Sequence, residues 1–215
     1  MHRHWSYGLT GTLLVLAVTC ARGQEVLDQI AARVESDIIL LSEVRTLSRY
    51  QMLVDGKAES DAAILDRLVD QWIVRNEADT ARFPHPSDVE IAHGVEHLQT
   101  SFASAEEYQA RKKQSGLSDK EIQRMMAGQL YLSNYLDSRF RPAVQVTAKQ
   151  VEDFYQEAVV PQVKVRNQVP PPLDASREYI LEALVQRGIN EQAEIWLKES
   201  RSRLHVDKFL KETGK

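Results

Sequence analysis

The chain has 215 residues, of which 27 are Lys or Arg and 31 are Asp or Glu, so its net charge is −4. A mildly acidic chain without blocks of basic residues is a poor nucleic-acid binder, and we expect no nucleic-acid partner. The only cysteine, Cys20, lies in the N-terminal leader, so disulfide bonds and thiol chemistry are excluded once that leader is removed.

Residues 1–23 have the pattern of a secretory signal peptide. A short, partly basic opening precedes the apolar run from Leu13 to Val18, which is too short to span a bilayer, since a span takes about 20 apolar residues. Ala21-Arg22-Gly23 matches the small-x-small cleavage rule, so we expect a cut after Gly23, with a second site after Ala21. A lipid anchor on Cys20 and a retained N-terminal anchor are the alternatives. The leader favours an exported, soluble protein without stable membrane insertion.

A β-hairpin is predicted directly after the leader. In an extended segment Ile30, Ala32 and Val34 share one face with Val26 and Asp28, and the apolar run Ile38–Leu40 follows a polar break at residues 35–37. A helix is then predicted to begin at Ser42 and to end at Asp55-Gly56. The next predicted helix runs from about Asp61 to Arg82. Its apolar stripe consists of Leu65, Leu68, Val69, Trp72 and Ile73.

Capping boxes mark the starts of four further helices. In this motif a Ser or Thr is followed three residues later by Glu or Gln, and the two side chains satisfy amide donors at the helix start. The pairs are Ser87 with Glu90, Ser104 with Glu107, Ser118 with Glu121, and Thr147 with Gln150. A last helix is predicted from about residue 173 to 203, with an optional kink at Gly188. The alternating tail Leu204–Asp207 predicts a short strand that pairs with the hairpin, so we expect a mainly α fold.

One catalytic-looking motif stands in the helix after Ser87. His93, Glu96 and His97 spell H-x-x-E-H, a pattern in which two histidines one turn apart bind zinc and the glutamate is the general base. The apolar residues of the same helix form the opposite face, so the histidines are expected to point to solvent. These apolar residues are Ile91, Val95, Leu98 and Phe102. We therefore expect no metal, no cofactor and no catalytic residue, and keep a zinc-dependent hydrolase as a minor alternative.

Candidate peptide-binding residues come from the helix after Ser118. Tyr131 and Tyr135 lie one turn apart, away from the broad apolar arc of that helix. They either pack against a neighbouring helix, which is the preferred interpretation, or offer a rigid amphipathic contact for an extended peptide. Met125 and Met126 are either core residues or flexible apolar binding residues. Together with Trp72 these residues form the candidate set.

Four segments, taken in order, resemble the SurA-like periplasmic chaperones, a group that includes parvulin-type foldases. They are VLDQIAARVESDIILLSEV near the start, ILDRLVDQWIVRNEA in the next helix, VTAKQVEDFYQE, and the closing PPPLDASREYILEALVQRGINEQAEIWLKESRSRLHV. The matching residues of the first segment are Asp28, Ile30, Ala32, Val34, Ile38, Ser42, Glu43 and Val44. The resemblance implies a helical chaperone domain that holds unfolded envelope proteins, outer-membrane proteins among them, without ATP.

The resemblance also predicts a missing enzyme domain. In the family a parvulin domain of about ninety residues begins with a strand similar to residues 163–166, which alternate as Val-Lys-Val-Arg. Asn167 then stands where the family has a histidine important to the isomerase site, and the proline run 170–172 follows at once. A strand is therefore expected here, cut short by a deletion, and no isomerase activity is expected.

The resemblance divides the chain into four parts. Residues 1–23 are the signal peptide, 24–160 the SurA-like N-terminal chaperone domain, 161–172 a Pro-rich linker at the site of the missing domain, and 173–215 the helix and strand that complete the chaperone domain. The expected partners are unfolded or extended polypeptides. A scaffold protein with one dedicated partner, or an isomerase whose catalytic domain arrives on another chain, are the alternatives.

Overall fold

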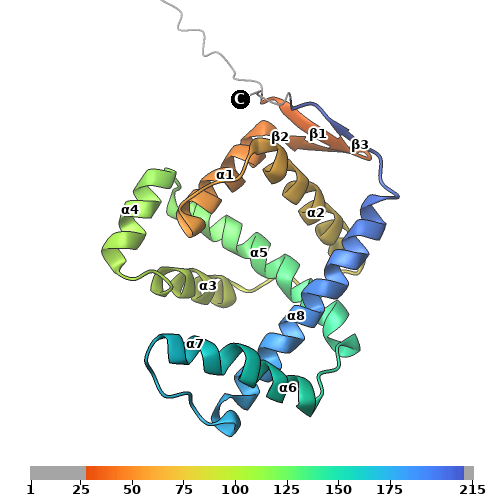
Figure 1. Cartoon of the computed structure of the whole chain (residues 1–215). Coiled ribbons are helices and arrows are strands. Elements are labelled where there is room, and N and C mark those ends of the chain that lie inside the picture. Colours follow the sequence, from red (N-terminus) through yellow and green to blue (C-terminus); the bar gives the residue numbers. More distant parts are fainter. Residues whose placement is uncertain (1–27, 211–215) are drawn as a thin grey trace, which may run out of the picture.

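A computed structural model describes residues 28–210 of the chain, and the predicted leader lies outside this range. The helices are α1 (Leu41–Asp55), α2 (Asp61–Thr80), α3 (Asp88–Thr100), α4 (Ala105–Ser115), α5 (Asp119–Phe140), α6 (Ala148–Phe154), α7 (Val160–Val165) and α8 (Leu173–Arg201). A 3₁₀ turn, η1 (Arg141–Ala143), follows α5, and a π-helical segment, η2 (Tyr155–Val159), joins α6 to α7. The predicted mainly α fold is confirmed (Figure 1). None of the described helices is long and apolar enough to cross a membrane.

A small antiparallel sheet joins the two ends of the described chain. Strands β1 (Ile30–Val34), β2 (Asp37–Leu40) and β3 (Val206–Lys208) lie in the order β2-β1-β3. The predicted hairpin and the predicted pairing of the tail with it are therefore confirmed. The single face predicted for β1 is wrong at its start. The register shifts between Ile30 and Ala32, so Ala31 and Ala32 are both buried while Ile30 is 43% exposed.

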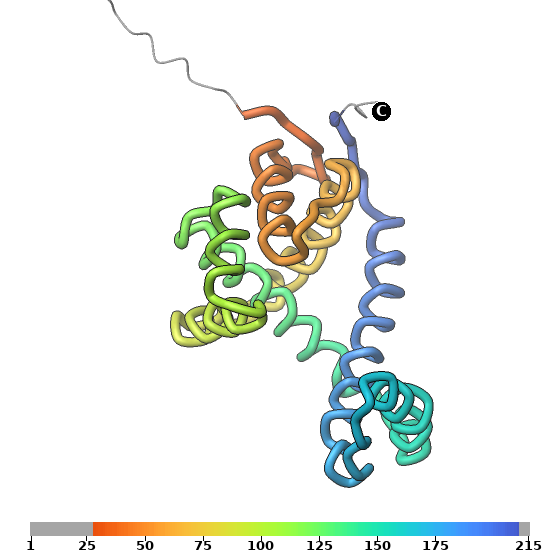
Figure 2. The backbone as a smooth tube through the Cα atoms, turned by 60° about the vertical axis from the view of Figure 1, so that its left-hand side comes forward, coloured from red at the N-terminus to blue at the C-terminus, as the bar shows by residue number. Residues whose placement is uncertain are grey.

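The core lies beneath the sheet and around α5. Helices α1 and α2 pack against the sheet and each other, α5 runs past both, α3 covers the N-terminal half of α5, and α4 packs mainly against α1 (Figure 1). Helix α8 contacts α2, α5 and α6 (Figure 2). The C-terminal helix therefore completes the core that the earlier helices form. Trp196 and Leu197 of α8 pack on the buried residues of α2 and α5, which is why the amphipathic tail helix is part of the core.

Most helix starts follow the predicted caps. The reciprocal hydrogen bonds of a capping box are present at Ser87, Ser118 and Thr147. Ser104 accepts from the backbone N–H of Glu107, but the Glu107 carboxylate accepts from Ala103 instead of Ser104, so this box is only half formed. Helix α1 begins one residue before the predicted Ser42.

The predicted strand at residues 163–166 is wrong, because these residues end a helix. Asn167 has a φ of 55°, its N–H donates to the Lys164 carbonyl (2.9 Å), and the N–H of Gln168 donates to the Val163 carbonyl (3.2 Å). This pair of bonds is a Schellman motif, in which Asn tolerates the left-handed position. Among residues 28–210 the strands are those of the β2-β1-β3 sheet, and residues 163–166 pair with none of them. Val159 and Val163 are four residues apart, a spacing that also suits a helix.

The Pro-rich linker is therefore shorter than predicted and covers residues 166–172. Pro172 has φ −55° and ψ 146°, which is polyproline II geometry, and the Tyr155 hydroxyl donates to the Pro171 carbonyl (2.7 Å).

Two other helix predictions concern α2 and α8. Helix α2 ends at Thr80, two residues before the predicted end at Arg82, and Arg82 has a left-handed φ of 51°, as Asn167 has after α7. Helix α8 is continuous through Gly188, where the helix lies directly against Val144.

Candidate functional site

A groove runs along one side of α2. It consists of two adjoining hollows of about 900 Å³ and about 320 Å³. The larger lies between α1, α2, α5 and the start of α3, and the smaller lies between α2 and strand β2. Five residues line both hollows, so they form one groove: Glu43, Leu68, Gln71, Arg75 and Asp79. We call this feature the α2 groove.

The sequence of α2 explains how one helix serves both the core and the groove. Its groove-lining residues recur at intervals of three and four and so share one face. They are Leu68, Gln71, Trp72, Arg75, Asn76 and Asp79. The neighbouring face carries Leu65, Val69 and Ile73, which are buried beneath the sheet. The predicted apolar stripe of α2 therefore divides between these faces, and Leu68 and Trp72 lie at the edge of the groove.

The walls of the larger hollow are mainly apolar. Met125, Ala127, Gly128, Tyr131 and Leu132 supply the α5 wall. Leu47 of α1, Leu68 of α2, and Pro86 and Ile91 at the start of α3 complete the apolar lining. Polar and charged residues make up the rest of the lining: Ser42, Glu43, Thr46, Gln71, Arg75, Asp79, His85, Arg124 and Gln129. This hollow therefore suits an apolar or aromatic side chain with a polar backbone.

Tyr131 orders one end of the larger hollow. Its hydroxyl donates to the Asp79 carboxylate (2.6 Å), and its ring stacks on that of His85 with centroids 4.3 Å apart. Burial and, after it, the hydrogen bond to Asp79 raise the pKa of Tyr131 to about 12. The hydroxyl is therefore a fixed donor at neutral pH, and it has no role as a base.

Two further carboxylates are ordered by neutral donors at the hairpin end. The indole N–H of Trp72 donates to Asp37 (2.8 Å), and the backbone N–H of Leu40 donates to Glu43 (2.7 Å). The first bond ties α2 to β2, and the second ties α1 to the same strand. Both bonds fix the positions of side chains that line the smaller hollow, namely Asp37, Trp72 and Glu43.

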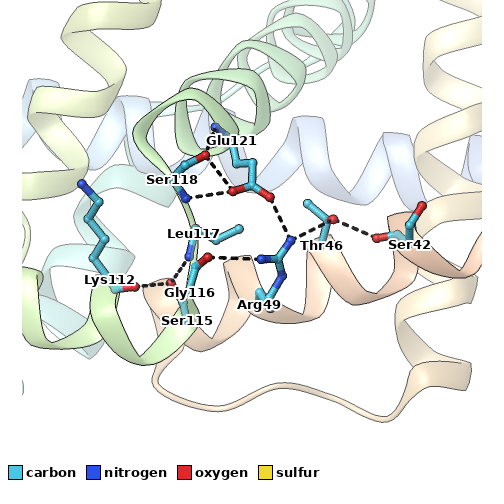
Figure 3. Close-up of polar contacts among 9 residues, drawn as sticks. All are labelled: Ser42, Thr46, Arg49, Lys112, Ser115, Gly116, Leu117, Ser118 and Glu121. Atoms are coloured by element: carbon cyan, nitrogen blue, oxygen red, sulfur yellow. Dashed lines mark hydrogen bonds and ion pairs between the residues drawn. The ribbon is translucent and has the colours of Figure 1, made fainter. Parts of the chain in front are cut away.

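A network centred on Arg49 fixes α1 against the turn between α4 and α5 (Figure 3). The guanidinium of Arg49 donates to the Gly116 carbonyl (3.2 Å) and to Glu121 (2.9 Å), which is also the capping partner of Ser118. Hydrogen bonds from Ser118 and then from Arg49 lower the pKa of Glu121 to about 2. Since Arg49 lies one turn from the groove residue Thr46, this network positions the α1 wall.

The structure brings together three of the five predicted peptide-binding residues. Trp72 lines the smaller hollow, and Met125 and Tyr131 line the larger one. Met126 and Tyr135 line neither hollow and are buried, at 8% and 6% exposure. Tyr131 is also buried, at 4% exposure, although it lines the larger hollow. Tyr135 packs edge-on against Phe83 (5.5 Å), so of the two interpretations of this tyrosine, packing against neighbouring elements is the correct one.

The H-x-x-E-H motif lies outside the groove. The side chains of His93 and Glu96 are 75% and 73% exposed and 3.8 Å apart, and His97 is also exposed. The prediction that both histidines face solvent is confirmed. Within residues 28–210, no three His, Cys, Asp or Glu side chains are placed to hold one metal ion.

Sequence reasoning missed the polar residues of the groove. Arg75, Gln71, Arg124 and His85 line it but stand in no motif. The available signal was the second face of α2, where Leu68, Gln71 and Arg75 recur at helical spacing. Nothing in the sequence indicated that α5 would lie opposite this face.

No protein-family model matches the chain. No curated protein matches it either.

Proposed function

We propose that the protein is a periplasmic, ATP-independent chaperone that binds unfolded envelope proteins, including outer-membrane proteins, in the manner of the SurA-like chaperones. The α2 groove carries this proposal. It is open at the surface, its larger hollow has apolar walls, and Trp72, Met125 and Tyr131 contribute to its lining. Such a lining shields an apolar segment of a client reversibly, because it offers burial without a deep, exclusive pocket.

The residues of the groove favour binding over bond-making chemistry. Tyr131 stays protonated at neutral pH because its pKa is raised to about 12, and Asp37, Glu43 and Asp79 each accept a hydrogen bond from a neutral donor. Prolyl isomerisation needs a shaped pocket to lower a barrier of about 20 kcal/mol, and the linker of residues 166–172 is too short to build one. We therefore expect no acceleration of cis/trans exchange in a proline tetrapeptide.

The chaperone activity is tested by aggregation of an unfolded β-barrel outer-membrane protein, followed by light scattering without nucleotide. Near-stoichiometric protein is expected to suppress the scattering. Gly128→Gln is the groove variant, because Gly128 lines the groove and a Cβ there meets no atom within 4 Å. The new side chain fills the groove without crowding the core, so suppression is expected to need several-fold more protein. Ser138→Gln, at an exposed position on the same helix, is the matched control and is expected to behave like the wild type.

Two results would contradict the proposal. If Gly128→Gln protects the client as well as Ser138→Gln does, the groove is not the client site. If the wild-type protein does not suppress aggregation at all, a scaffold with one dedicated partner becomes the better explanation of the groove.

A further inference from the structure

Within residues 28–210, the hairpin end of the α2 groove combines an unpaired strand edge with negative charge that no ion pair compensates. Strand β2 is at the edge of the sheet, and three consecutive residues, Asp37, Ile38 and Ile39, line the smaller hollow. Successive side chains of a strand point to opposite faces, so a hollow lined by three in a row follows the strand edge. An edge of this kind is where an extended peptide can add as a further strand.

The orientation of the β2 backbone shows which groups face the groove. The N–H of Leu40 points away from β1, since it donates to Glu43, which lines the groove. Backbone groups alternate in direction along a strand, so the N–H and C=O of Ile38, two residues earlier, face the same way. The register of the hairpin agrees with this. Val34 and Asp37 flank the two-residue turn and form a hydrogen-bonded pair, so the next pair, Arg33 with Ile38, is not hydrogen-bonded, and the backbone groups of Ile38 point away from β1.

The charge of this end is negative. Asp37, Glu43 and Asp79 all line the smaller hollow, against the single basic residue Arg75. Each carboxylate accepts from a neutral donor, namely the Trp72 indole, the Leu40 amide or the Tyr131 hydroxyl. Among residues 28–210, none of the three forms an ion pair with a Lys or Arg. Neutral donors fix these side chains but leave their charge uncompensated.

We propose that this end binds an extended polypeptide segment that pairs with the backbone of Ile38 and places a Lys or Arg side chain among Asp37, Glu43 and Asp79. The inference rests on the proposed function and specifies which client segments bind. An apolar side chain of the same segment enters the larger hollow beside Met125. The two hydrogen bonds to Ile38 set the extended conformation, and the basic residue sets the position of the segment along the groove.

The test uses fluorescence anisotropy with octapeptides that alternate apolar and polar residues and carry Lys, norleucine or Glu at one central position. The Lys peptide is expected to bind about tenfold more tightly than the Glu peptide at low salt, and this preference is expected to shrink at 0.5 M salt. Methylating single backbone amides of the Lys peptide is expected to weaken binding about fivefold at the one position whose N–H donates to the Ile38 carbonyl, and little at the other positions.

Protein variants identify the charges responsible. In the triple variant Asp37→Asn, Glu43→Gln, Asp79→Asn, the preference for Lys over Glu is expected to disappear, while the norleucine peptide binds as before. The matched control neutralises three exposed carboxylates of α8 outside the groove, by Glu178→Gln, Glu191→Gln and Glu194→Gln. It is expected to keep the preference. Thermal unfolding of both variants confirms that they are folded.

Several outcomes would overturn the inference. Equal binding of the Lys and Glu peptides, with aggregation suppression intact, removes the basic-segment inference but leaves the chaperone proposal standing. Equal effects of methylation at every amide remove the strand pairing. A dimer that dissociates when the Lys peptide is added would show that β2 pairs with a second copy of the chain. No binding of any peptide, together with no aggregation suppression, overturns the proposed function as well.

Discussion

Gly188 allows α8 to lie directly against the segment after η1, and its replacement tests how tightly the tail helix is held. A Cβ at position 188 would lie 2.6 Å from one methyl group of Val144, closer than carbon atoms can approach, and 3.1 Å from the other, which is a tight contact. Gly128 is also inside a helix, but a Cβ there meets nothing within 4 Å. The two glycines therefore differ in packing, while their secondary structure is the same.

The magnitude follows from two opposing effects. Alanine is favoured over glycine in a helix interior by about 1 kcal/mol, so Gly128→Ala is expected to raise the free energy of unfolding by about that amount. At position 188 the same gain is opposed by overpacking against Val144, which costs about 1–3 kcal/mol. We expect Gly188→Ala to lower the free energy of unfolding by about 0–2 kcal/mol, so the two variants differ by about 1–3 kcal/mol.

Urea unfolding followed by tryptophan fluorescence measures both variants. In a Val144→Ala background the crowding methyl groups are gone, and Gly188→Ala is then expected to stabilise the protein by about 1 kcal/mol, as at position 128. The reasoning fails if Gly188→Ala stabilises the wild-type protein as much as Gly128→Ala does. In that case α8 would move away from Val144 at no cost, and its docking would be loose.

Three other predictions follow from the fold and the motifs. Truncation after Val169 removes α8 and β3 and is expected to abolish cooperative unfolding, because the buried side chains of α2 and α5 lose their cover; a sharp transition near the full-length midpoint would show that α8 is an appendage. Because the folded-state pKa of Glu121 is lowered to about 2, its charge stabilises the fold above the unfolded-state value of 4.5, and this contribution is lost as the pH falls from about 4.5 to about 2. The stability difference between the wild type and Glu121→Gln, which keeps an acceptor for Ser118, is expected to vanish over that pH range in urea unfolding; a difference that does not change with pH would contradict this. Equimolar zinc is expected to leave the thermal midpoint unchanged, since His93 and His97 are exposed; bound zinc that is lost in His97→Ala together with a hydrolytic activity would overturn this prediction.

Local signals predicted the secondary structure well where short-range chemistry decides it. The capping boxes at Ser87, Ser118 and Thr147 predict the helix starts correctly, because their hydrogen bonds join residues only three positions apart. The same locality explains the error at residues 163–166. Four alternating residues are too few to distinguish a strand from a helix. The left-handed residue that ends this helix is Asn167 and not the more usual Gly, so the end of the helix has no clear signal in the sequence.

The sequence by itself determined the helical class, the hairpin and the apolar stripes of α2 and α8, because periodicity and capping act between near neighbours. The tertiary structure decided which apolar residues are buried and which remain open. Met125 and Met126 are adjacent in the chain, yet only Met125 lines the groove. Tyr131 and Tyr135 are both buried, but only Tyr131 lines the groove. Periodicity gives the direction of a side chain around its own helix but not the partner that covers it. That partner comes from α1, α2 and α8, whose positions depend on contacts between residues far apart in the sequence.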